Sequence, residues 1–172
     1  IINHKDKDKN IKFNKIDIFN YLAKNQKPFD LILIKQTIHF FNPIQIKKLL
    51  RLCKKNLSAK GVILIFSLEV RRNQIPCFTL MKKKLTEGLT RDIMTQKIII
   101  KSLSGLTIKK FHFLVRVSKK EYINMIKKKY ISCLLNLSQN EIDDGIQEIE
   151  KNYKTIIKFK DTLTCIKYTK LY

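Results

Sequence analysis

Two short apolar runs separated by an amphipathic segment constrain the fold of this chain most. Residues 29–34, FDLILI, have the length and composition of a strand that is covered on both faces. Asn42 and Pro43 suit the N-cap and first position of a helix over about 43–57, whose apolar residues recur at helical spacing: Ile46, Leu49, Leu50, Cys53 and Leu57. Residues 62–69, VILIFSLE, form a second buried run. Strands joined in this way are parallel neighbours in a right-handed crossover, so the sequence predicts an α/β, doubly wound, mostly parallel sheet.

The segments around this unit carry weaker patterns. Residues 11–18 alternate apolar and polar side chains and predict a strand that ends near Asp17. A polar turn is expected at 58–61. Residues 76–87 predict a helix that Gly88 can close. Residues 91–104 fit either a helix or a strand, and Gly105 before the next pattern favours a helix that ends there.

The last third of the chain predicts a strand, two helices and a final sheet segment. Residues 107–117 alternate cleanly and read as a strand. A helix is expected over about 119–136, and a second begins where Ser138 and Glu141 have the spacing of a capping box. Residues 155–170 supply one or two strands, most simply the antiparallel edge partner of 107–117.

Composition indicates a folded protein without a membrane span. The 172 residues are 44% hydrophobic, which favours a single domain over 1–172. No apolar run is long enough to cross a membrane, and nothing at the start has the layout of a secretory signal, so neither is expected. The four cysteines lack metal-ligand spacing and favour a reducing, cytoplasmic setting, with no metal expected. The abrupt start at Ile1 suggests that an amino-terminal portion has been left out.

The net charge of +22 is weak support for a nucleic-acid partner. Of the 36 basic residues, 31 are lysine, accompanied by abundant Ile and Asn, as an AT-rich coding sequence would give. A generally solvated basic surface accounts for this bias, because net charge reports on solubility rather than on specificity. Nucleic acid therefore stays an unfavoured alternative partner.

Several local motifs resemble the class I S-adenosylmethionine-dependent methyltransferases, in particular their small-molecule, trans-aconitate-like branch. The resemblance covers KIDIF, FDLILIKQTIHFF, LLRLCKKNLSAKGVILIF and YINMIKKKYISCLLNLSQNEIDDGIQEI. It implies a Rossmann-like sheet with an antiparallel C-terminal strand and a helical insertion at about 119–153. It also implies S-adenosylmethionine as cofactor and a small-molecule methyl acceptor, with a carboxylate as one candidate. The family's glycine-rich loop is absent, so either the protein is a degenerate relative or, as the abrupt start favours, the fold is N-terminally incomplete.

The resemblance assigns roles to five residues near the two predicted strand ends. Asp17 would accept a hydrogen bond from the adenine amino group, and Ile18 would pack near the ring. Lys35 and Gln36 would lie where cofactor and acceptor meet. His39 would serve as a general base, since imidazole titrates near neutral pH. The alternatives are a solvated carboxylate at Asp17, a surface lysine at Lys35 and a structural histidine at His39.

A second group of residues is a candidate substrate-binding lid. Arg116, Lys129, Tyr130 and Ser132, with Lys128 beside them, could bind a carboxylate through charge-assisted hydrogen bonds. The alternative is a lysine-rich helix face in water. Two other functions stay open at this point: a nucleic-acid-binding module or RNA methyltransferase remnant, and a noncatalytic subunit that docks on another chain.

Overall fold

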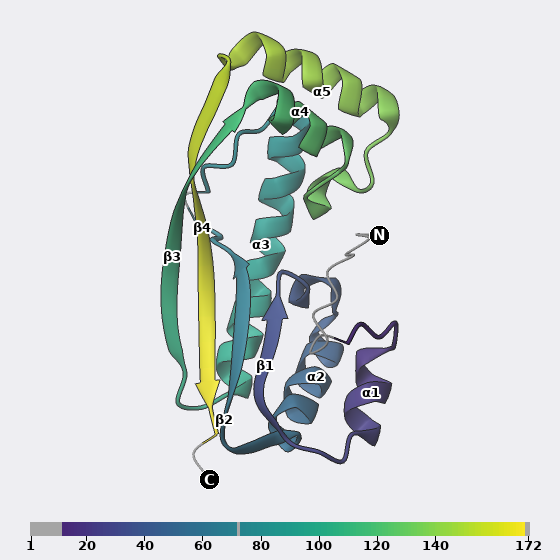
Figure 1. Ribbon diagram of the computed structural model, residues 1–172, viewed down its shortest axis with the longest axis vertical. Helices are drawn as coiled ribbons and strands as arrows, with labels where there is room; N and C mark the ends of the chain where they lie inside the picture. The colour runs from purple at the N-terminus through teal and green to yellow at the C-terminus, as the bar shows by residue number, and fades with distance from the viewer. Residues whose placement is uncertain (1–11, 72, 171–172) are drawn as a thin grey trace.

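The computed structural model describes residues 12–71 and 73–170, which form an α/β structure around a four-stranded sheet (Figure 1). The strands are β1 (Phe29–Lys35), β2 (Leu57–Leu68), β3 (Thr107–Ser118) and β4 (Ile156–Thr169), and their order in the sheet is β1-β2-β4-β3. β1 and β2 are parallel, whereas β4 is antiparallel to both of its neighbours. The predicted α/β fold, with a parallel crossover and an antiparallel last strand, is confirmed. The sheet is mixed, because it contains both parallel and antiparallel pairs.

Helix α2 (Pro43–Lys55) joins the two parallel strands, close to its predicted bounds. Asn42 accepts a hydrogen bond from the backbone N–H of Gln45, whose side chain accepts one from the N–H of Asn42. This capping box satisfies backbone donors that a helix start otherwise leaves free. The predicted apolar face is buried at Ile46, Leu49, Leu50 and Cys53.

Strand β2 begins five residues earlier than predicted because the expected turn at 58–61 is a bulge within the strand. Phe29 pairs with Leu57 and Leu31 with Val62, so β2 carries extra residues between these pairs. Lys60 has a φ of 65°, and a Cβ at Gly61 would lie 2.9 Å from the carbonyl oxygen of Phe29. A glycine is therefore required where the bulge approaches β1.

The two helices predicted over 76–104 are one helix, α3 (Thr79–Ser102), and the predicted stop at Gly88 is wrong. The apolar positions keep helical spacing across Gly88, with Met81, Leu85 and Leu89 all buried. Packing of this continuous stripe outweighs the low helix propensity of one glycine. Gly105, with a φ of 71°, lies in the turn that leads into β3.

The last strand is not an edge strand, contrary to the simplest expectation. β4 pairs with β3 from Thr107↔Lys167 to Ser118↔Ile156 and with β2 from Val62↔Thr169 to Leu68↔Leu163. β3 forms the edge instead. The interior position of β4 fits its burial, since Thr164, Cys165 and Ile166 are all buried.

The helical insertion lies between β3 and β4, as predicted, but its first helix is shorter. α4 (Lys119–Lys127) ends in a turn where Lys129 has a φ of 50°, and a 3-10 turn, η2 (Ser132–Leu134), follows it. α5 (Gln139–Asn152) begins with the predicted capping box of Ser138 and Glu141.

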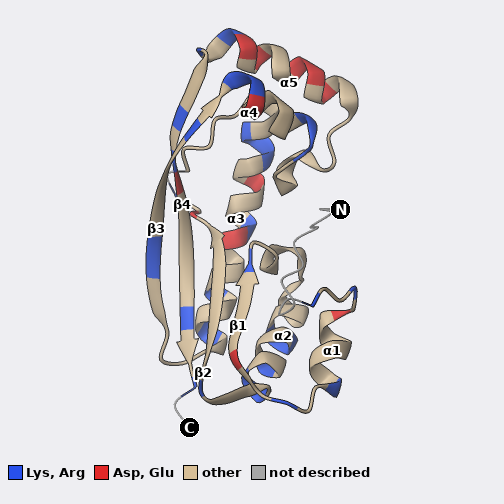
Figure 2. Cartoon of the chain, in the orientation of Figure 1, with Lys and Arg blue, Asp and Glu red and all other residues tan. Residues whose placement is uncertain are grey.

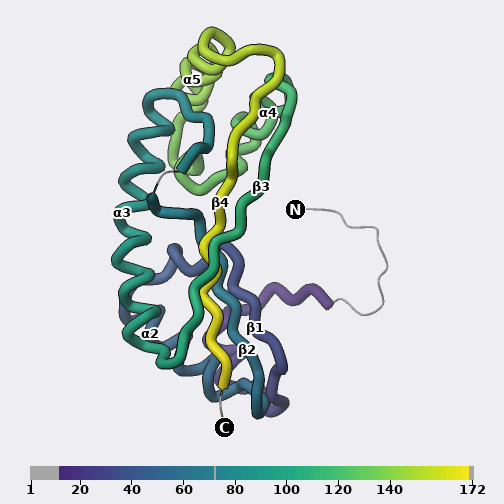
Figure 3. The backbone as a smooth tube through the Cα atoms, turned by 90° about the vertical axis from the view of Figure 1, so that its left-hand side faces the viewer, coloured from purple at the N-terminus to yellow at the C-terminus, as the bar shows by residue number. Residues whose placement is uncertain are grey.

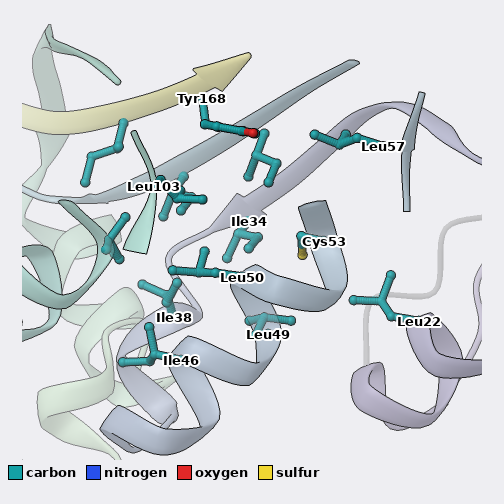
Figure 4. Close-up of a cluster of buried hydrophobic side chains, with 14 residues drawn as sticks. Leu22, Ile34, Ile38, Ile46, Leu49, Leu50, Cys53, Leu57, Leu103 and Tyr168 are labelled. Carbon is teal, nitrogen blue, oxygen red and sulfur yellow. The ribbon is translucent and has the colours of Figure 1, made fainter. Parts of the chain in front are cut away.

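Two hydrophobic clusters stabilise the fold. One joins the helix-covered face of the sheet to α2 and the end of α3 through residues such as Ile34, Leu50 and Ile99 (Figure 4). The other joins the start of α3 to the insertion and includes Phe78, Tyr122 and Ile149. α3 takes part in both clusters and connects the sheet to the insertion. In the parts of the chain that the structure describes, no helix is both long and apolar enough to cross a membrane.

The strand predicted over 11–18 is wrong for the residues that the structure describes, and residue 11 lies outside them. Residues 12–17 have no regular structure, and α1 (Ile18–Lys24) starts directly afterwards. The Asp17 carboxylate accepts a hydrogen bond from the N–H of Asn20 at 2.9 Å and caps the start of α1. This helix cap, rather than the alternation of apolar and polar residues, determines the structure of the segment.

Candidate functional site

The carboxyl ends of β1 and β2 meet at one edge of the sheet, which we call the rim. Lys35 lies opposite Phe66, and the N–H of Gln36 donates to the carbonyl of Phe66 at 2.8 Å. Gln36 then adopts a φ of 52°, which turns the chain out of the sheet into a 3-10 turn, η1 (Ile38–Phe40). Lys35 and Gln36 are both exposed at this edge. Such edges of parallel strands are where open α/β sheets bind their ligands.

His39 lies just past the rim, half-buried, with its ring against Phe40 at a centroid distance of 4.2 Å. Its Nε2 atom is buried and has no hydrogen-bond partner among the described residues. Asp92 on α3 is near enough to interact with it: burial raises the pKa of Asp92, and the nearby charges of His39 and Arg91 oppose that rise. Buried polar atoms are normally hydrogen-bonded, so this nitrogen of His39 is an exception within the described residues.

The start of α1, which follows Asp17, lies near the segment that leaves the rim. The end of α1 is tied to the start of β1, because the Asn56 side chain donates to the carbonyl of Leu22 and the N–H of Phe29 donates to the carbonyl of Asn56. α1 and β1 run in opposite directions from this point (Figure 1), so α1 starts toward the carboxyl end of β1. The Phe19 ring meets Phe41 edge-on, with centroids 5.5 Å apart.

The contacts of Asp17 are local, however. Its carboxylate caps α1, and no hydrogen bond joins it to residues 35–39 within the described chain. Ile18, the first residue of α1, is 36% exposed. The structure thus places the start of α1 near the segment after the rim, while the Asp17 carboxylate serves as a local helix cap.

Sequence reasoning missed Glu69, which lies one residue beyond β2 and is 5% exposed. Its carboxylate accepts from Lys110 at 2.7 Å, from the Thr164 hydroxyl at 3.3 Å and from the N–H of Arg71 at 3.0 Å. Burial raises the pKa of Glu69, but these donors and the Lys110 charge together outweigh burial and hold the pKa below its usual value. The feature of the sequence that could have identified Glu69 is a carboxylate directly after a buried strand.

The proposed substrate lid is not assembled in the part of the chain described here. The Lys129 ammonium donates to the carbonyls of Leu137, at 2.6 Å, and Leu135, at 3.3 Å, so it closes the turn around η2. The hydroxyl of Tyr130 is hydrogen-bonded to that of Tyr122 at 3.0 Å, and burial raises the pKa of Tyr130. Arg116 and Ser132 are exposed, and no hydrogen bond connects them to the other two.

Two hollows on the surface lie away from the rim. One is lined by α3 and α5 at Phe78, Lys83, Glu141 and Glu148. The other lies between residues 70–77, α3 and the start of β4. Neither includes a predicted site residue, and the described residues hold no cluster of His, Cys, Asp and Glu that could bind a metal ion.

No family model matches this sequence, and no curated protein matches it. Among solved structures, an S-adenosylmethionine-dependent methyltransferase from Archaeoglobus fulgidus is similar at 18% identity and a TM-score of 0.46, over 95% of this chain and 70% of that one. A phosphoethanolamine N-methyltransferase of Haemonchus contortus, bound to phosphomonomethylethanolamine and S-adenosylhomocysteine, is similar at 14% identity and a TM-score of 0.43. That match covers 88% of this chain and 36% of the nematode protein. The function of this chain is therefore argued from its own residues.

Proposed function

We propose that this chain belongs to a class I S-adenosylmethionine-dependent methyltransferase that acts on a small molecule. The observation that carries the proposal is the connectivity of the sheet. A parallel crossover from β1 to β2 is followed by a last strand, β4, that is antiparallel to both neighbours, and the helical insertion lies directly before β4. These are the features that the sequence resemblance implies for this family.

The residues at the rim fit only part of the cofactor. Gln36 and Lys35 offer exposed polar groups at the strand end, and Ile18 and the Phe41 region offer apolar surface for an adenine ring. The methionine part needs a glycine-lined approach, and the four glycines of the chain lie elsewhere: in the β2 bulge, within α3, before β3 and within α5. When bound, the cofactor supplies an electrophilic methyl group on a sulfonium.

The contribution of this chain would be alignment and proton handling. The Gln36 side chain, held by its left-handed backbone beside β2, would bind polar groups of the cofactor and orient those of the acceptor beside it. His39 would serve as the general base toward the acceptor, which requires its buried Nε2 atom to become exposed. Alignment alone can lower a barrier by roughly 7–11 kcal/mol, so no further acid or base is required.

Equilibrium dialysis with labelled S-adenosylhomocysteine tests the proposal. We expect Gln36→Ala to weaken binding roughly tenfold, as expected for one hydrogen bond to a charged group. Gln147→Ala, which changes an exposed glutamine of α5, is the matched control and should bind as the unaltered chain does. Equal binding by both variants, or no binding at millimolar ligand, would remove the support for a cofactor site at the rim.

We also propose that residues 1–172 form one domain of a cytoplasmic enzyme. Support comes from the cysteines, which are free at all four positions. Burial raises the pKa of Cys53 to about 12, so this thiol behaves as a core side chain rather than as a redox group. Substrate binding by Arg116 and Ser132 stays part of the proposal, with a carboxylate-bearing acceptor as the ligand.

A further inference from the structure

One face of the sheet is apolar and is covered by the described helices only at the end of β3 and the start of β4, where Val117, Ile157 and Phe159 pack against the insertion. α2 and α3 lie together on the other side of the strands (Figure 3), where Ile63 and Ile65 are 0% and 1% exposed. Side chains alternate between faces along a strand, so the opposite side carries Leu31 and Leu33, which are 55% and 54% exposed. We call this side the open face: Leu31, Leu33, Leu64, Phe66, Phe111, Phe113 and Leu163 with Lys35, Lys109 and Lys167.

Aromatic rings occupy the middle of the open face. Phe66 on β2 and Phe111 on β3 have ring centroids 5.9 Å apart, although a strand lies between them in the sheet. Phe113 continues the row along β3, and Phe111 and Phe113 are 42% and 51% exposed. Exposed rings on adjacent positions of a sheet are a surface on which flat ligands can stack.

The charged side chains that surround these rings are mostly lysines. The register places Lys35, Phe66, Cys165 and Lys109 in one row across the four strands. Lys167 lies in the neighbouring row, beside Leu64. Asp161 also lies on this face by its register position, and one of its carboxylate oxygens is buried. Figure 2 shows several Lys and Arg positions, in blue, along β3 and β4.

We propose that the open face binds single-stranded nucleic acid. Bases would stack on Phe66, Phe111 and Phe113, and phosphates would contact Lys109 and Lys167. Proteins that bind single strands combine exposed aromatic rings, on which bases stack, with lysines that contact phosphates. Charge alone would attract any polyanion. The proposal goes beyond methyl transfer. The open face shares Lys35 and Phe66 with the rim, but its test positions Phe111, Lys109 and Lys167 lie outside the rim, so either proposal can fail alone.

Fluorescence anisotropy with an oligothymidylate of about twelve nucleotides tests stacking and charge separately. An abasic oligonucleotide of the same length carries the same phosphates without bases, and we expect it to bind about tenfold more weakly. Phe111→Leu keeps apolar bulk but removes the ring, and should weaken oligothymidylate binding roughly tenfold. Phe13→Leu, at a ring that is 81% exposed in another part of the chain, is the control and should leave binding unchanged.

The lysines are tested through the salt dependence. Lys109→Gln with Lys167→Gln should reduce the slope of log affinity against log salt by about 1.4, because each phosphate contact on a single strand contributes about 0.7. Lys47→Gln with Lys55→Gln, at exposed positions of α2, makes the same change in net charge and should alter the slope much less.

Two results would overturn the proposal. Equal affinity for the abasic and base-containing strands would show that the bases do not contribute to binding and that the open face attracts polyanions in general. An unchanged affinity in Phe111→Leu would indicate that the face is covered by polypeptide instead. Should Phe111→Leu unfold, as circular dichroism would reveal, Phe113→Leu is the second variant and carries the same expectation.

Discussion

Glu69 combines burial with a cluster of donors, and its charge should therefore support the folded state. Because its pKa is lower when folded than when unfolded, the unfolded chain binds more protons in this range and stability rises with pH. The contribution is fully present above the ordinary glutamate pKa of about 4.3 and is lost as pH falls through the folded value. Urea unfolding between about pH 3 and 7 would measure this loss.

Lys110→Met should remove most of the pH dependence of stability that Glu69 contributes. It deprives the buried carboxylate of its partner at 2.7 Å, and we expect a loss of about 1–3 kcal/mol at neutral pH. Lys109→Met is the matched control, since Lys109 points to the open face and makes no ion pair in the described residues. A profile that is the same for both variants would show that the pair adds no stability.

Gly145 is required by a close approach between helices. A Cβ there would lie 2.5 Å from Cδ2 of the buried Phe78 ring, which belongs to the core around the start of α3. Gly145→Ala should therefore destabilise the fold by about 1–3 kcal/mol through overpacking, measured by denaturant unfolding. An unchanged midpoint would mean that Phe78 can move without cost.

At the scale of elements, Gly88 in α3 differs from Gly145, because a side chain would fit there. A Cβ at Gly88 would meet nothing within 4 Å, and the residue lies in the middle of a 24-residue helix. Gly88→Ala should stabilise the protein by about 0.5–1 kcal/mol, because alanine loses less backbone entropy on folding. Gly105→Ala, at a φ of 71°, should instead destabilise it. A destabilised Gly88→Ala variant would contradict a continuous α3.

The elements that were predictable from sequence are those that local contacts decide. α2 and α5 begin with capping boxes whose members are three residues apart, and Phe111, Phe113, Val115 and Val117 occupy alternate positions of β3. α3 was divided in two, because the packing that carries a helix across Gly88 involves distant residues. The interior position of β4 depends on pairing with both β2 and β3, which periodicity does not encode.

The same distinction applies to the candidate site. Lys35, Gln36 and His39 follow a strand directly, so their position at the rim could be predicted from the strand alone. The Glu69 and Lys110 pair joins residues far apart in sequence across the sheet, and Asp92 reaches the neighbourhood of His39 only through α3. Asp17 was misread because capping and strand alternation compete over a few residues.

At the scale of the whole molecule, the net charge of +22 should oppose folding through self-repulsion. Raising the salt concentration from about 0.01 M to about 0.15 M shortens the Debye length from roughly 30 to 8 Å. The midpoint of thermal unfolding should rise over this range. A variant with three fewer lysines on α2 should gain less from salt, and a midpoint that falls with salt would indicate that attractive ion pairs dominate instead.

The central claim is that the rim formed by β1, β2 and η1 binds the adenosyl part of a methyl-donor cofactor. The most direct measurement is an amide NMR titration of the chain with S-adenosylhomocysteine. Our account predicts shifts concentrated at Lys35, Gln36 and His39, with smaller shifts at Asp17 and Ile18. Saturable shifts confined to the insertion, or none at millimolar ligand, would contradict it.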